Sequence, residues 1–147
     1  MSTVPIAATT PHTDAVVAAL EEAHILVGRA VHPDGGGWQG NPGNSNYVPY
    51  SVVYPMSGSP DGNPAEPLAY LDYSAQISCW GHTATQAEAE ADKVRAALIG
   101  KRLTVPGRRC YPVYPPPGSA PPIRRNDSPP PVEYLAVVEI AFRSQAQ

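Results

Sequence analysis

The sequence predicts an α+β domain in which two helices pack on one face of a mainly antiparallel sheet, joined by long loops rich in proline and glycine. Three observations support this fold class: stretches of strict two-residue alternation, a well-capped amphipathic helix between two of them, and 19 prolines gathered in a few segments. A length of 147 residues suits one domain with one modest core.

The clearest strand pattern covers residues 71–80, where apolar and polar side chains alternate without a break. Residues 48–56 and 132–143 alternate in the same way. One face of each strand is polar, which is typical of an antiparallel sheet covered on one side only. We expect the turn-rich stretch at 57–67 to join the first two strands as a long hairpin. The predicted core face of the central strand consists of Leu71, Tyr73, Ala75, Ile77 and Cys79.

The second predicted helix follows Thr83, which forms a capping box with Gln86, and ends before Gly100. Its apolar stripe is Ala84, Ala87, Ala91, Val94 and Leu98. We expect this stripe to face Tyr73, Ala75, Ile77, Val138 and Ile140. The residues expected to point outward are Glu88, Glu90, Asp92, Lys93 and Arg95.

The first predicted helix is capped by Thr13 or Asp14 and runs to about residue 23. We therefore expect residues 1–12 to form a flexible arm and residues 13–147 to form the domain. Proline is too dense at 115–131 for a helix or a central strand, so this segment is expected to be a loop.

Charge is segregated along the chain. Residues 93–125 carry eight of the ten basic residues and no acid, so this segment has a charge of about +8, although the whole chain has −3. Such asymmetry is typical of a surface that faces a charged partner, although neutralisation by acids of the same domain is the simpler interpretation. The predicted interface residues are Lys101, Arg102, Arg108, Arg109, Arg124 and Arg125.

No catalytic motif accompanies this pattern. The sequence has no G-x-S-x-G or H-E-x-x-H motif and no cysteine–histidine spacing typical of zinc. Cys79 lies on an apolar strand face, which predicts a buried, inert thiol. No apolar run approaches the roughly 18 residues of a membrane helix. We therefore expect a non-enzymatic protein that needs no cofactor or metal and contacts no membrane.

The order of these segments resembles the tail terminator, or tail completion, proteins of siphophages that infect actinobacteria. The resemblance covers roughly residues 13–143, and each motif in it is structural and unspecific by itself. The proline-rich stretch at 115–131 departs from the family pattern. The matching segments are Asp14–Gly28, Pro33–Gly37, Tyr47–Pro55, Gln76–Gly81, Thr85–Leu98 and Leu103–Arg108.

The resemblance implies a ring, six-membered in that family, at the head-proximal end of the virion tail, assembled in the host cytoplasm. Such a ring ends elongation of the tail-tube protein and meets the neck or head-completion proteins, while DNA passes through without specific binding. Two alternatives stay open from the residues alone. One is another head–tail connector, such as a head-closure or neck protein. The other is a small nucleic-acid-binding protein that uses the basic segment, in which Tyr111 and Tyr114 follow Arg108 and Arg109.

Overall fold

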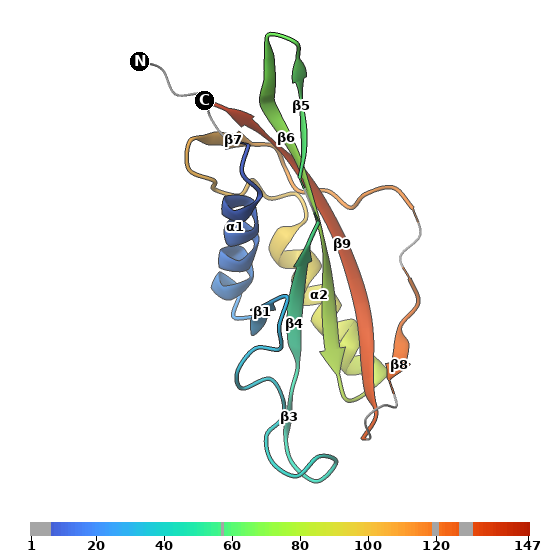
Figure 1. Ribbon diagram of the computed structural model, residues 1–147. Coiled ribbons are helices and arrows are strands. Elements are labelled where there is room, and N and C mark those ends of the chain that lie inside the picture. The colour runs from blue at the N-terminus through green and yellow to red at the C-terminus, as the bar shows by residue number, and fades with distance from the viewer. Residues whose placement is uncertain (1–6, 57, 119–120, 127–130) are drawn as a thin grey trace.

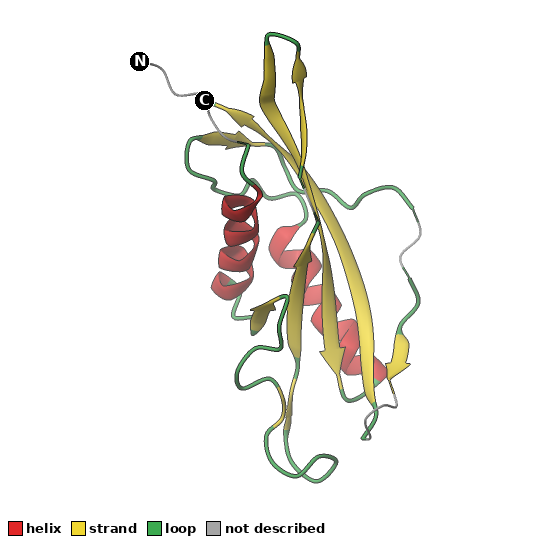
Figure 2. Cartoon of the chain, in the orientation of Figure 1, coloured by secondary structure: helices red, strands yellow, loops and turns green. Residues whose placement is uncertain are grey.

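A computed structural model describes residues 7–56, 58–118, 121–126 and 131–147. Helices α1 (Thr9–Glu22) and α2 (Ala84–Leu98) cover one face of a twisted sheet, as Figures 1 and 2 show. The α+β fold class predicted from the sequence is therefore confirmed. The strands are β1 (Val27–Arg29), β2 (Gly37–Trp38), β3 (Tyr47–Val48), β4 (Tyr50–Pro55), β5 (Ser59–Asn63), β6 (Glu66–Gly81), β7 (Arg108–Cys110), β8 (Arg124–Asn126) and β9 (Glu133–Ala146).

The main sheet has the order β1-β4-β6-β9-β7, with β5 added to β6 and β8 added to β9. Only the β1–β4 pair is parallel; the other pairs in the described part of this sheet are antiparallel. The two long strands β6 and β9 form its centre, from Tyr70 opposite Gln145 to Gly81 opposite Tyr134. Strands β2 and β3 form a separate small antiparallel ladder.

The predicted core is confirmed. The alternate residues of β6 from Leu71 to Cys79 are at most 1% exposed, and Val138 and Ile140 of β9 are buried with them. On α2 the apolar stripe is buried from Ala87 to Leu98, while Ala84 at its start is only half-buried. Alanines on this stripe let the helix axis approach the sheet closely.

The start of α2 follows the expected capping pattern in part. The side chain of Thr83 accepts a hydrogen bond from the backbone nitrogen of Gln86 at 3.1 Å. The Gln86 side chain accepts from the backbone nitrogen of His82 at 2.8 Å, one residue earlier than a capping box requires. The outward placement of Glu90 was wrong, since its side chain is only 4% exposed.

The first helix begins earlier than predicted. Helix α1 starts at Thr9, its N-cap is Ala8, and no side chain caps it. Thr13 is therefore inside the helix, where its hydroxyl bonds the Tyr73 hydroxyl at 2.8 Å. The predicted arm is thus wrong over Thr9–His12, because burial of His12 extends the helix. Residues 1–6 of the predicted arm lie outside the described residues.

Two segments predicted as loops contain strands. The stretch expected to be a turn holds β5 and the start of β6, so the hairpin turns at Pro64–Ala65 and projects beyond the helices (Figure 1). In the proline-rich segment, residues 124–126 pair with β9 as β8. These three residues contain no proline, so each can donate a backbone hydrogen bond to the ladder. Neither helix of the described residues is long and apolar enough to cross a membrane.

Candidate interface surfaces

The basic segment is continuous in sequence but divided in space. Arg108 and Arg109 belong to β7, and Arg124 and Arg125 belong to β8. The expectation that residues 115–131 form a loop is therefore corrected at Arg124 and Arg125. Both strands pair with β9, at opposite ends: Arg109 lies opposite Gln145 and Arg125 opposite Tyr134. At a rise of about 3.3 Å per residue, the two arginine pairs lie on the order of 35 Å apart.

Lys101 and Arg102 form a third basic position, at the wall of a groove of about 430 Å³ between α1 and the segment after α2. Half of its lining residues are alanines, most of them from α1 and one from α2, and Glu22 of α1 also lines it. Both basic side chains are exposed, and Arg102 donates one hydrogen bond to the carbonyl of Cys110 at 3.3 Å. The described residues give neither of them an acidic partner within 4 Å.

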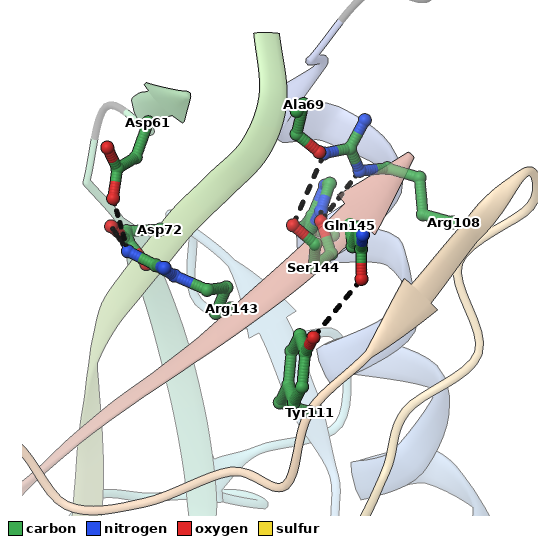
Figure 3. A network of polar contacts seen from close by, with 9 residues as sticks. Asp61, Ala69, Asp72, Arg108, Tyr111, Arg143, Ser144 and Gln145 are labelled. Carbon is green, nitrogen blue, oxygen red and sulfur yellow. Dashed lines mark hydrogen bonds and ion pairs between the residues drawn. The ribbon is translucent and has the colours of Figure 1, made fainter. Parts of the chain in front are cut away.

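Arg108 differs from its neighbours because it binds inside the subunit (Figure 3). Its Nε donates to Ser144 Oγ at 2.7 Å, and its Nη2 lies 3.3 Å from the carbonyl oxygens of Ala69 and Ser144. Burial lowers the pKa of the guanidinium. Arg108 therefore joins β7 to β6 and β9, whereas Arg109 is exposed and makes no comparable contact with a described residue.

The Arg108 contacts continue to a buried histidine. Because Arg108 donates to Ser144, the serine hydroxyl is free to donate to His12 Nε2, 2.6 Å away. His12 Nδ1 then donates to the carbonyl of Ala8 at 2.7 Å, which assigns the neutral Nδ1–H tautomer. The ring packs against Tyr73 and Phe142, whose own ring centres are 5.1 Å apart. Burial lowers the pKa of His12, and the nearby positive charge of Arg108 acts in the same direction.

A second arginine ties the projecting hairpin to β9 (Figure 3). Arg143 Nε and Nη2 contact the two carboxylate oxygens of Asp72 at 2.7 and 2.9 Å, and Nη2 also lies 2.5 Å from Asp61 Oδ2. The hydrogen bonds from Arg143 lower the pKa of Asp72. The guanidinium also lies 5.0 Å from the centre of the Tyr70 ring. This cluster fixes the base of the hairpin against the sheet.

Under α2 lies a buried carboxyl group that the sequence pattern missed. Ser51 Oγ donates to Glu90 Oε2 at 2.7 Å. Burial raises the pKa of Glu90, and the hydrogen bond from Ser51 opposes that shift. Burial likewise raises the pKa of the neighbouring Cys79 thiol to about 12. The prediction that Cys79 is a buried free thiol is confirmed, and its high pKa makes it a poor nucleophile.

The face of the sheet opposite the helices carries exposed aromatic and aliphatic side chains. Tyr54 lies opposite Gln76 and Tyr114 opposite Ala141, so both side chains project from the uncovered face. Tyr54 and Met56 are each 44% exposed and Tyr114 is 48% exposed. The sequence analysis did not identify this surface, because its apolar residues come from two distant parts of the chain, residues 54–56 and Tyr114.

Among the described residues, no three His, Cys, Asp or Glu side chains lie close enough together to hold a metal ion. His32 packs on Tyr50 with ring centres 4.4 Å apart. His82 bonds the Gln86 side chain through Nδ1 at 2.6 Å. Both histidines therefore have local contacts at the ends of secondary-structure elements.

The fold is similar to that of a chain in a solved structure, the virion of a native gene transfer agent particle. The alignment has a TM-score of 0.55 and covers 90% of this chain and 92% of that chain, with 16% sequence identity. No protein-family model matches the sequence, and no curated protein matches it. At this identity the comparison establishes a shared fold.

Proposed function

We propose that this protein is a structural, non-enzymatic subunit of a phage-type virion, and that it forms the ring that caps the tail tube. The observation that carries the proposal is the fold shared with a virion chain over nearly the whole length of both. The resemblance of the sequence to siphophage tail terminator proteins supports the finer assignment to the head-proximal end of the tail.

The surfaces of the subunit are consistent with an assembly role. Tyr54, Met56 and Tyr114 lie on an uncovered sheet face, and Lys101 and Arg102 border a groove without an acid partner among the described residues. Exposed apolar patches and unmatched charge are typical of subunit contacts. In the proposed particle, neighbouring copies form the ring, tail-tube protein lies on one side of it, and a neck or head-completion protein lies on the other.

The proposal is tested by deleting the gene and imaging the particles by electron microscopy. A missing tail terminator should give tubes of unregulated length that are not joined to heads. A missing head-closure protein would instead give normal-length free tails and heads that lose DNA. Normal, infectious particles would overturn the virion assignment, and the head-closure result would overturn the terminator assignment alone.

The basic residues provide a second test, directed at the contacts. We propose that Lys101, Arg102, Arg109, Arg124 and Arg125 face acidic surfaces of neighbouring subunits or of the tube, while DNA passes through the ring without specific binding. Arg109→Glu should block joining of the tail while leaving the free subunit folded, and Arg109→Gln should have a smaller effect. Complete, infectious tails from the Glu variant would remove Arg109 from the interface.

A further inference from the structure

The outer edge of β9 is paired at both ends and open between them. At one end it pairs with β7 and with Tyr114, whose backbone exchanges two hydrogen bonds of 2.9 Å with Ala141. At the other end β8 pairs with Glu133–Leu135. The described residues supply no strand opposite 136–140. Such an open stretch of edge presents backbone donors and acceptors that a further strand can satisfy.

The direction of these backbone groups follows from the ladder. The nitrogen and oxygen of Ala141 face Tyr114, and the Arg143 oxygen accepts from Tyr111, so odd-numbered residues of β9 face outward. Val137 and Glu139 therefore direct two N–H and two C=O groups into the opening. No hydrogen bond links these groups to another described residue.

The proline-rich segment does not close the opening. Hollows of about 280 and 140 Å³ lie along it, between α2, β9 and the proline-rich segment. The residues of that segment that line them are Pro115, Pro116, Gly118, Pro121 and Ile123. Proline has no backbone N–H, so Pro115, Pro116 and Pro121 cannot donate to the β9 carbonyls. Space and unused hydrogen-bonding groups therefore occur together at this edge.

The opposite edge of the same sheet is β1. Leu26 accepts a hydrogen bond from Ser51 and Ala30 donates one to Val53, so the even-numbered residues of this segment face β4. Val27 and Arg29 consequently direct their two N–H and two C=O groups away from the sheet. The described residues provide no hydrogen bond to these groups either.

We propose that β1 of one copy pairs with the open stretch of β9 in the next copy, so that the sheet continues across the subunit boundary. The proposal rests on the ring proposed above. Each edge offers two backbone donors and two backbone acceptors. The Arg29 side chain is already paired with Asp14 of its own subunit, so the backbone groups carry the contact. The open stretch lies on the side of β9 that faces away from β6, and β1 is the other end of the sheet, so the contact is head-to-tail. A head-to-tail contact forms a ring when its rotation closes.

The strand directions determine whether the pair across the boundary is parallel or antiparallel. Strand β1 is parallel to β4, and β4 and β9 are both antiparallel to β6, so β1 and β9 run the same way within one copy. In a ring whose axis follows the strands, rotation preserves this direction. The strand pair across the boundary is then parallel.

Proline substitution tests the backbone contact directly. Glu139→Pro removes an outward N–H without removing a hydrogen bond to β6, and Glu139→Ala is the matched control that keeps the N–H. Arg29→Pro and Arg29→Ala form the same pair on β1. Each proline variant should raise the concentration needed for ring formation at least about tenfold over its alanine control, because one interface hydrogen bond is lost and its carbonyl partner stays unpaired.

Amide hydrogen exchange on the wild-type chain keeps the proposal testable if a proline variant does not fold. In rings from purified particles, the amides of Val27, Arg29, Val137 and Glu139 should exchange at least tenfold more slowly than in the free subunit. Unchanged exchange in an intact ring overturns the strand pairing and leaves the proposed function standing. A chain that stays monomeric in mature particles overturns both.

Discussion

Replacing Arg108 by alanine should destabilise the free subunit far more than replacing Arg109, although the two arginines are adjacent. Arg108 donates to the Ser144 side chain and to the carbonyls of Ala69 and Ser144. A hydrogen bond from a charged donor contributes about 1.5–3 kcal/mol. The two contacts of 3.3 Å are weak, and the burial that lowers the pKa of Arg108 opposes its charge. We therefore expect a net loss of about 2–4 kcal/mol.

The measurement is urea unfolding of the two variants and the wild type, followed by tryptophan fluorescence. Arg109→Ala should change the free energy of unfolding by less than about 0.5 kcal/mol, as is usual for an exposed side chain. The slope against urea should stay the same in all three proteins, so that the midpoint reports stability alone. Equal losses in the two variants would refute the assignment of Arg108 to a structural network.

Three further predictions concern the interior. Leu98→Ala should lower the free energy of unfolding in urea by about 2–5 kcal/mol, because Leu98 is fully buried. Its control, Lys93→Ala on the outer side of α2, should lower it by under about 0.5 kcal/mol. Similar losses would mean that the packing face is misassigned. Glu90→Gln should stabilise the protein at neutral pH. Because the pKa of Glu90 is raised in the folded protein, wild-type stability falls as pH rises from the unfolded-state pKa of Glu90 through its folded-state pKa. That gain should shrink in acid, and a gain independent of pH would contradict this cause. The pKa of His12 is lowered in the folded protein, so stability should be lost as pH falls below the unfolded-state pKa of histidine, near 6.5. Thermal unfolding between about pH 5 and pH 7 should show a smaller loss for His12→Gln than for the wild type.

Much of the sheet could be predicted because its two long strands alternate without interruption. From Leu71 to Cys79 every second side chain is apolar, and the same residues are buried. A period of two allows only one assignment of faces when one face is buried. The apolar stripe of α2 could be predicted equally well. A helical period of 3.6 residues places Ala87, Ala91, Val94 and Leu98 on one side of the helix.

Buried polar residues could not be predicted, because their partners come from distant parts of the chain. Glu90 is polar and sits among outward-facing charges, yet Ser51 of β4 provides its hydrogen bond. His12 precedes the predicted start of α1, yet Ser144 provides a partner from the far end of the chain. A polar side chain is compatible with burial when a partner is present. Helical periodicity carries no information on that partner.

The basic segment shows how a one-dimensional pattern can mislead about an interface. Its arginines are close in sequence, but β7 and β8 hold them at opposite ends of β9, and Arg108 directs its charge inward. Charges on the order of 35 Å apart do not act together in water, since the screening length at physiological salt is about 8 Å. The contacts proposed for Arg109 and Arg124 would therefore be with different partners, or with different parts of one large partner. In the proposed ring, a subunit that lies between two other proteins would contact one of them on each side of the ring. Repulsion among these arginines accordingly does not act across the whole length of the segment.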